Sequence, residues 1–166
     1  MSKVAIVGAT GFTGIELLKI LKVHSKIIKI DLFSFSNPGK KINDFCSDLK
    51  FDDTLNDFSS IIYKDYDLVF FACPNGTVMK AYSDFKDEEV KIIDLAADFR
   101  LDDEKIWREY YGEKHICPNL LSKTVYGLTE LNREKIREAT IVANPGCYPT
   151  AAIISLFPLL KEKLIE

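Results

Sequence analysis

The sequence has few of the side chains that hold metal ions. Its only histidines are His24 and His115, and its four cysteines stand far apart, with no CxxC pair. Structural zinc sites need thiolates and imidazoles at close, regular spacing, so no metal site is predicted. Scattered cysteines also argue against a disulfide framework. Most of them are expected to be small buried hydrophobic residues: Cys46, Cys73 and Cys117.

The chain also lacks an excess of positive charge and a long apolar segment. With 22 basic and 25 acidic residues its net charge is −3, which leaves no basic field for nucleic acid or an anionic membrane. No apolar run approaches the roughly 20 residues of a membrane span or a secretory signal. The sequence therefore predicts a cytoplasmic protein that binds neither nucleic acid nor membranes.

What remains is an ordinary globular composition. The 166 residues are 47% hydrophobic and 28% charged, as expected for a chain that folds around its own core. Neither an internal repeat nor a linker-like stretch divides the chain, so a single domain over residues 1–166 is predicted.

Short apolar runs of strand length alternate with stretches of helical periodicity. Strands are predicted at residues 3–7, 27–33, 67–72, 91–95 and 140–143, and helices at 15–21, 77–85, 102–111, 132–139 and about 147–164. The polar segment 37–55 and the segment 115–128 are each predicted to be a long loop or a small excursion from the fold. This alternation predicts an α/β fold with a doubly wound, mainly parallel sheet and helices on both faces.

The first predicted strand and helix are joined by a GxxGxxG segment formed by Gly8, Gly11 and Gly14. Glycines at such a turn allow a pyrophosphate to approach the backbone, and the helix start offers free N–H groups to that anion. The placement predicts a dinucleotide site in a Rossmann-type domain. The alternative, that the glycines only form a tight turn, stays open.

The end of the second strand indicates which dinucleotide is bound. NAD-binding domains usually have an acidic residue at this tip, whereas Asp31 lies two residues inside the strand. Ser34, Ser36 and Lys40 at or beyond the tip can accept a 2′-phosphate without repelling it, so NADP(H) is predicted. For Lys40, an ordinary solvated loop lysine is an equally good interpretation.

Cys147 follows the last predicted strand and opens a helix, because Pro149 fits only a first helical turn. The partial positive charge of a helix N-terminus stabilises a thiolate. Such a thiolate can attack a carbonyl, with the backbone N–H groups of residues 146–148 stabilising the oxyanion. The alternative is a small cysteine that packs a helix start; the neighbouring glycine loop favours the nucleophile.

These motifs together resemble N-acetyl-gamma-glutamyl-phosphate reductase. The resemblance rests on GATGFTG in the first turn, NPGK after the second strand, DLAADFRL at 94–101, YGLTEL at 126–131 and above all NPGCYPTA at 144–151. It runs in order from Lys3 to the last helix. It covers essentially the whole chain, but only the N-terminal half of the family's proteins.

The resemblance implies NADPH-dependent reduction of N-acetyl-glutamyl 5-phosphate to the semialdehyde in arginine biosynthesis, through a thioester on Cys147. Asn144 and Arg100 are candidates for orienting the substrate phosphate, because an arginine in a loop after a strand suits bidentate anion binding. An ion pair of Arg100 with Asp98 or Asp102 is an equal alternative. The resemblance places Ser36 and Lys40 near the adenosine phosphate. It also assigns the dinucleotide cradle to six residues of the glycine loop: Gly8, Thr10, Gly11, Phe12, Thr13 and Gly14.

Three features depart from the family pattern. Phe35 stands where many members have an arginine, and Asn75 stands where many have a histidine. In the family, a histidine of a second domain serves as the catalytic base, and the same domain forms the homo-oligomer contact. These residues do not include that domain, so little or no turnover is predicted for this chain alone. Two other functions stay open: a stand-alone, non-catalytic dinucleotide-binding module, and a lysine-pathway reductase of a carrier-bound acyl phosphate.

Overall fold

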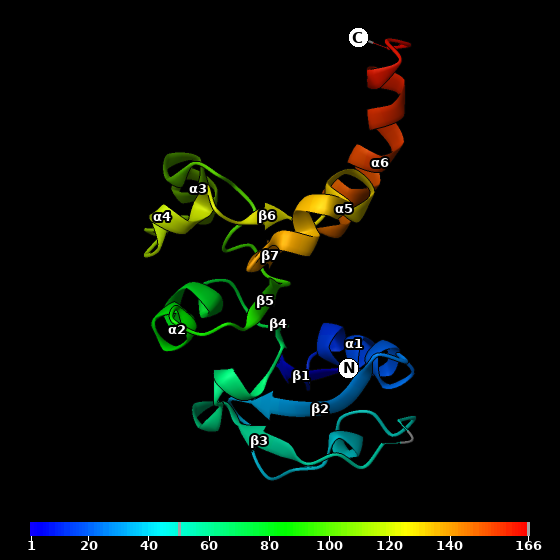
Figure 1. Ribbon diagram of the computed structural model, residues 1–166, viewed down its shortest axis with the longest axis vertical. Coiled ribbons are helices and arrows are strands. Elements are labelled where there is room, and N and C mark those ends of the chain that lie inside the picture. Colours follow the sequence, from blue (N-terminus) through cyan, green and yellow to red (C-terminus); the bar gives the residue numbers. More distant parts are fainter. Residues whose placement is uncertain (50, 166) are drawn as a thin grey trace.

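The computed structural model describes residues 1–49 and 51–165, and they form an α/β domain around one sheet (Figure 1). Its seven strands are β1 (Ser2–Val7), β2 (Ile27–Ser34), β3 (Leu55–Asp57), β4 (Leu68–Phe71), β5 (Lys91–Asp94), β6 (Val125–Tyr126) and β7 (Ile141–Ala143). The six α-helices are α1 (Phe12–Lys22), α2 (Thr77–Phe85), α3 (Glu104–Tyr111), α4 (Pro118–Leu121), α5 (Thr129–Glu138) and α6 (Cys147–Lys161).

The strand order is β3-β2-β1-β4-β5-β7-β6, and every neighbouring pair is parallel. The predicted doubly wound fold is therefore confirmed. From β1 the chain builds outward to β2 and β3, then returns to the other side of β1 to form β4. This reversal between β1 and β4 is the switch point at which open α/β sheets bind ligands, at the carboxyl ends of the strands.

Helices cover both faces of the sheet, as predicted. Figure 1 shows α1 and α5 on one side and α2, α3 and α4 on the other. Alternate residues of β1 divide between the two sides: Ala5 and Val7 belong to the core beneath α2, whereas Val4 and Ile6 pack with residues of α1. This period of two is the geometry of a strand buried on both faces.

Both segments predicted as loops contain regular structure, and to that extent the loop prediction was wrong. The second half of the sheet gains β6 and α4 within residues 115–128, and β3 begins at the end of segment 37–55. These strands are only two and three residues long and each pairs with one neighbour. Two or three residues are too few to show an alternating pattern in the sequence. These segments become strands because they pair with β2 and β7.

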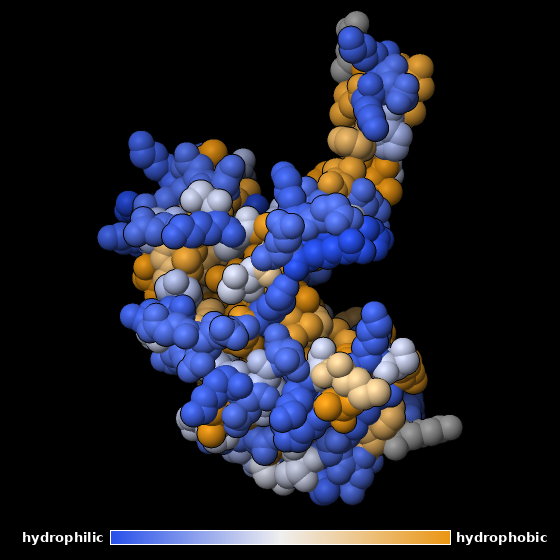
Figure 2. Space-filling model, in the orientation of Figure 1, coloured by the Kyte–Doolittle hydropathy of each residue, from blue (hydrophilic) through white to orange (hydrophobic). Residues whose placement is uncertain are grey.

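Helix α6 begins at Cys147, as predicted, and ends at Lys161, three residues before the predicted end. It has no buried residue and projects away from the sheet at the upper right of Figure 1. Apolar side chains on it face solvent, as the orange patches of Figure 2 show. Within residues 1–49 and 51–165, no helix has both the length and the apolar character that crossing a membrane requires.

Candidate functional site

The carboxyl edge of the sheet collects the residues that carry chemistry. The glycine loop follows β1, the Phe35 turn follows β2, and residues 73–76 follow β4. Next along the edge, the segment 95–103 follows β5 and the Cys147 loop follows β7. Because parallel strands end at the same edge, segments far apart in sequence become neighbours here.

The glycine loop is shaped by close backbone packing. Gly8 has a φ of +81°, and a Cβ there would lie 2.3 Å from the carbonyl oxygen of Ala72. A Cβ on Gly14 would lie 2.4 Å from the carbonyl oxygen of Gly8. Neither clash can be relieved by a side-chain rotation, so these two positions need glycine for the strand, loop and helix to meet.

The start of α1 leaves hydrogen-bond donors unused. Ile15 N–H makes the first helical bond, to the Gly11 carbonyl, and no side chain caps the helix. The backbone N–H groups of Phe12, Thr13 and Gly14 therefore have no partner within the helix. Phe12 is 83% exposed and Thr10 is half-buried. This first turn presents a row of donors and a positive helix end, the arrangement that binds a pyrophosphate.

The tip of β2 offers no carboxylate to a ribose. Asp31 lies inside the strand. Its Oδ2 accepts a hydrogen bond from the Tyr66 hydroxyl at 2.9 Å and forms an ion pair with Lys29 Nζ at 2.6 Å. Asp57, opposite Ser34 in the neighbouring β3, caps the turn of Ser59 with its Oδ1. These hydrogen bonds lower the pKa of Asp57. Both acids of this region are thus engaged within the protein.

Asn37, which the sequence did not single out, joins all three residues predicted at this tip. Its backbone N–H donates to Ser34 Oγ at 3.2 Å, its Nδ2 donates to Ser36 Oγ at 3.0 Å, and its Oδ1 accepts from Lys40 Nζ at 3.1 Å. Ser34 is buried, so its hydroxyl closes the turn, while Ser36 and Lys40 are exposed. Asparagine favours such turns because it bonds to nearby backbone and side chains, but the residues it would join are not readable from one sequence.

Cys147 is the first residue of α6 and is exposed. Thr150 N–H donates to the Gly146 carbonyl at 3.0 Å, and no side chain caps the helix. The N–H groups of Cys147 and Tyr148 are therefore free of helix partners, and Pro149 falls in the first turn as predicted. The thiol and these donors share one exposed loop at the sheet edge.

Arg100 and Asn144 meet beside this loop. Arg100 Nε donates to the Asn144 carbonyl at 2.8 Å and Nη2 donates to the Leu95 carbonyl at 2.9 Å. Nη1 faces Gly146, where a Cβ would lie 3.2 Å from it. No ion pair of Arg100 with Asp98 or Asp102 is found among residues 1–49 and 51–165. The guanidinium thus fastens the Cys147 loop to the segment after β5 and keeps Nη1 toward the loop.

Two aspartates under this edge were not predicted to be buried. Asp98 accepts from the backbone N–H groups of Gly76 at 2.6 Å and Met79 at 3.1 Å, and so caps α2. Asp94 is fully buried; its Oδ1 accepts from Ala96 N–H at 2.9 Å, while no hydrogen bond to its Oδ2 is found among the described residues. Burial, reinforced by the charge of Asp98, raises the pKa of Asp94 to about 7. Both lie in the motif 94–101, and Asp98 was named only as a partner of Arg100, because one sequence does not show which aspartates become buried.

Cys46, Cys73 and Cys117 are half-buried rather than buried as expected from the sequence. His115 is fully buried, its Nδ1 accepts from Cys117 N–H at 3.1 Å and its Nε2 therefore donates to the Asp98 carbonyl at 2.8 Å. Burial raises the pKa of Cys73 to about 12. No cluster of metal ligands occurs in the described part of the chain.

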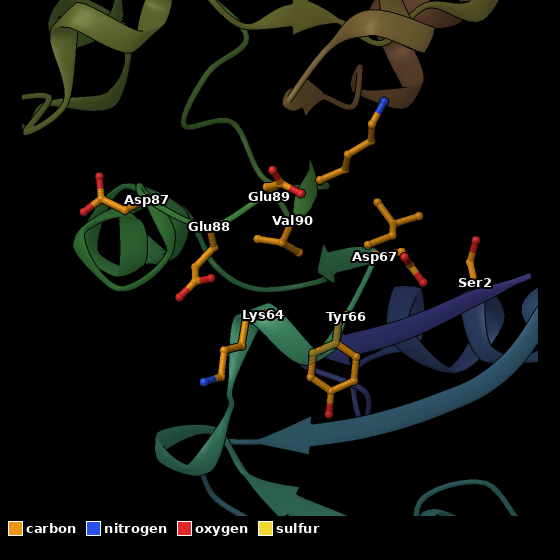
Figure 3. A pocket seen from close by; sticks show the side chains of 10 residues that line it. Ser2, Lys64, Tyr66, Asp67, Asp87, Glu88, Glu89 and Val90 are labelled. Carbon is orange, nitrogen blue, oxygen red and sulfur yellow. The ribbon is translucent and has the colours of Figure 1, made fainter.

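A separate hollow of about 720 Å³ lies at the amino ends of β1, β4 and β5 (Figure 3). It is open and bordered by charged side chains, among them Lys64, Asp67, Glu88 and Glu89. It contains neither the glycine loop nor Cys147. We assign the functional site to the carboxyl edge, because the free helix donors and the exposed thiol lie there.

The fold and this edge define a dinucleotide-binding α/β domain, and solved structures share the fold. Aspartate semialdehyde dehydrogenase II of Vibrio cholerae superposes with a TM-score of 0.72 at 20% identity, over 97% of this chain and 47% of that one. The Candida albicans aspartate semialdehyde dehydrogenase, solved with NADP, superposes with a TM-score of 0.68 at 15% identity, over 98% and 47%.

The chain belongs to the family described as semialdehyde dehydrogenase, NAD binding domain, which matches residues 3–139. Among curated proteins it is 44% identical to the N-acetyl-gamma-glutamyl-phosphate reductase of Nitrosomonas eutropha and 46% identical to that of Acinetobacter baumannii. Each alignment covers 100% of this chain and 49% of the relative. The chain thus spans about half the length of the curated relatives it matches.

Proposed function

We propose that this chain is the cofactor-binding, nucleophile-bearing part of an NADPH-dependent N-acetyl-gamma-glutamyl-phosphate reductase of arginine biosynthesis. The observation that carries the proposal is the exposed Cys147 at a helix start, on the same sheet edge as an uncapped glycine-loop helix. The names of the relatives favour an N-acetylglutamyl substrate over a carrier-bound one. A cytoplasmic location and a homo-oligomer formed through the unmatched half of the relatives are parts of the same proposal.

The glycine loop fits a dinucleotide. The donors of residues 12–14 point from an uncapped helix start, and Gly11 has no neighbour closer than 3.5 Å to a built Cβ, which leaves its surface open. These donors, with Thr10 and Thr13 beside them, would hold the pyrophosphate of a bound dinucleotide. The glycine loop after β1 and the Cys147 loop after β7 are separated by three strand spacings, about 14 Å, which a dinucleotide would have to span.

The carboxylate-free tip of β2 supports NADP(H) over NAD(H). Asp31 is engaged inside the strand with Tyr66 and Lys29, so it is not placed to bind a ribose 2′-hydroxyl. Asp57, at the end of β3, keeps its charge, and its Oδ1 caps the turn at Ser59. Ser36 and Lys40 are exposed beyond the β2 tip and are proposed to contribute hydrogen bonds to the adenosine phosphate alongside other cations at this edge, with Ser34 shaping the turn beneath them.

Cys147 starts the reaction by covalent catalysis. Its Sγ attacks the acyl carbon, the bond between this carbon and the phosphate oxygen breaks, and phosphate departs. The acyl group then remains on Cys147 as a thioester. The N–H groups of Cys147 and Tyr148 stabilise the oxyanion, while Arg100 Nη1 and the Asn144 side chain hold the phosphate. The chemistry that the cofactor supplies is a hydride to the thioester carbon, which releases the aldehyde and returns the thiolate.

The described residues supply no imidazole to assist this chemistry. Both ring nitrogens of His115 are bonded inside the protein, and His24 follows the C-terminal end of α1, at the opposite edge of the sheet from the glycine loop. Proton transfer by a positioned base contributes about 10²- to 10⁴-fold. The chain alone is therefore expected to form the thioester but to turn over slowly.

Acyl transfer to the isolated chain tests the proposal. Incubation with N-acetyl-glutamyl 5-phosphate followed by peptide mass spectrometry is expected to find one acyl group on Cys147, absent in Cys147→Ser and unchanged in the matched control Cys46→Ser. Acylation of another cysteine, or of none, contradicts the nucleophile assignment. An unreactive Cys147 in a chain that binds NADPH tightly would instead support a non-catalytic binding module.

Steady-state assay of the reverse, phosphate-dependent reaction addresses turnover separately. We expect the 166-residue chain to oxidise the semialdehyde with NADP⁺ at a small fraction of the rate of a complete reductase. Substantial activity from this chain would show that the base is already within it.

A further inference from the structure

On the side of the β2 tip that faces α2, an exposed lysine stands beside two aromatic rings. Lys80, Phe35 and Phe58 line a hollow of about 240 Å³, together with Thr77, Ala81 and Asp84. Phe35 follows β2, Phe58 follows β3, and Lys80 lies in the first turn of α2. The hollow therefore joins the tip of the second strand to the start of the helix after β4.

The ammonium of Lys80 is directed to the carboxyl edge of the sheet. Gly76 caps α2 with a φ of +87°, and a Cβ built on it would lie 3.6 Å from Lys80 Nζ and 3.7 Å from Cε. The side chain thus folds back over the loop that follows β4. Among residues 1–49 and 51–165 no ion pair of Lys80 is found, including with Asp84 one turn further along α2. Its charge is available to a ligand.

The two rings form a surface for a flat group. Phe35 is 53% exposed, and its ring centroid lies 4.3 Å from that of Phe58, with 42° between the planes. Phe58 in turn contacts the buried Phe71 edge-on, which fixes the platform to the core. An exposed, anchored aromatic ring is a stacking surface for a nucleobase.

Lys40, the other cation near this tip, is directed elsewhere. Its Nζ donates to Asn37 Oδ1 and lies 5.8 Å from the centroid of Phe45. Phe45 packs with the core on the α1 side, whereas Phe58 packs with the core beneath α2. The two lysines therefore flank the tip on opposite sides, and the one beside the stacking surface is Lys80.

We propose that Lys80 neutralises the 2′-phosphate of NADP(H) while Phe35 stacks on its adenine, and that Lys80 thereby sets the preference for NADP(H) over NAD(H). This inference rests on the proposed cofactor function and names the group that discriminates. A dinucleotide whose pyrophosphate lies on the glycine loop has its adenosine at the β2 tip, next to this hollow. A cation on α2 replaces the arginine expected at position 35, and the aromatic ring at 35 provides the stacking.

Calorimetric titration with 2′,5′-ADP and 5′-AMP separates the 2′-phosphate from the rest of the adenosine. Lys80→Gln is expected to lower the affinity for 2′,5′-ADP and for NADPH by about tenfold, as for loss of one charge-assisted bond. It is expected to change the affinity for 5′-AMP and for NADH by less than about twofold. Lys86→Gln, at the far end of α2, is the control for charge and is expected to leave all four affinities unchanged. Phe35→Leu is expected to weaken 2′,5′-ADP and 5′-AMP alike.

The outcomes distinguish this inference from the proposed function. If the wild-type chain prefers NADPH but Lys80→Gln weakens all ligands equally or none, Lys80 is not the discriminating group and the cofactor function stands. Equal wild-type affinity for NADPH and NADH overturns this inference and the NADPH preference of the proposed function, whereas dinucleotide binding and the acylation of Cys147 are tested by separate measurements. If the wild type binds neither dinucleotide, the proposed function fails and this inference fails with it.

Discussion

The two faces of the sheet differ in how far the chain covers them. Beneath α2, α3 and α4 a continuous core runs from β1 to β7 and includes the fully buried Phe71 and Trp107. On the α1 face the buried core is confined to the β1 and β2 end, and Phe70 of β4 and Ile93 of β5 are only half-buried. Figure 2 shows apolar residues in the notch between α1 and α5.

The difference shows which face of the sheet contributes most of the stability of the domain and which contributes little. The α2 face contains most of the aromatic packing. It also anchors Phe58 and the loop of Asp98 at the carboxyl edge of the sheet. The α1 face lacks equivalent cover because neither α5 nor α6 has a buried residue. Stability is therefore expected to depend on the α2 face, while the α1 face beyond β1 contributes little.

The sharpest way to break this comparison uses two neighbouring phenylalanines of β4. Phe71→Ala removes a fully buried ring on the α2 face and is expected to lower the free energy of unfolding by about 3–5 kcal/mol. Phe70→Ala, on the half-covered face, is expected to cost about 1 kcal/mol, because less apolar area leaves water on folding. Urea unfolding followed by circular dichroism measures both; equal losses would contradict the unequal cover.

The pH dependence of stability reports on Asp94, buried at the end of β5. Burial raises the pKa of Asp94 to about 7, against about 4 in an unfolded chain. Between these values the folded chain keeps a proton that the unfolded chain has released, so the free energy of unfolding falls as pH rises toward 7. The largest slope is about 1.4 kcal/mol per pH unit.

Asp94→Asn is expected to remove this dependence of the free energy of unfolding on pH. The stability of the variant relative to the wild type is therefore expected to rise between pH 5 and pH 7. The neighbouring charges of Asp98 and Arg100 are unchanged in it. Asp87→Asn, whose side chain is 88% exposed, is the control and should run parallel to the wild type. Parallel curves for Asp94→Asn would show that the buried carboxyl does not titrate in this window.

The smallest effect is expected on α6. Leu160 is 50% exposed and packs in neither core, so Leu160→Gln is expected to change the free energy of unfolding of this chain by no more than about 0.5 kcal/mol. Thermal unfolding of the two chains side by side measures the change. A loss comparable to that of Phe71→Ala would mean that α6 folds back on the domain in solution.

Much of the fold was predictable from the sequence because its signals are local. Glycines in the β1–α1 turn, Pro149 in a first helical turn and apolar runs of strand length each act within a few residues. Strands β3 and β6 were missed because their two or three residues become strands only through pairing with β2 and β7. Local periodicity holds no information about such a partner.

The structure brings the predicted glycine loop and Cys147 to one edge, whereas the hydrogen bonds that support this edge were not predicted. The loops of Gly11 and Cys147 lie at the same edge, as the parallel topology requires. Arg100 was identified, but its bonds to the carbonyls of Leu95 and Asn144 were not. The bond to Asn144 joins residues 44 positions apart and depends on which strands are neighbours, and the order of strands is not encoded in any one segment.

By itself the sequence determined the alternation of strands and helices, the glycine turn after the first strand and the helix that begins at Cys147. The tertiary structure alone decided which side chains are available to a ligand. It engaged Asp31 with Tyr66, buried Asp94 and directed Lys80 over Gly76. The physical reason is that composition and periodicity act locally, whereas burial, charge pairing and exposure at an edge arise only when distant strands pack together.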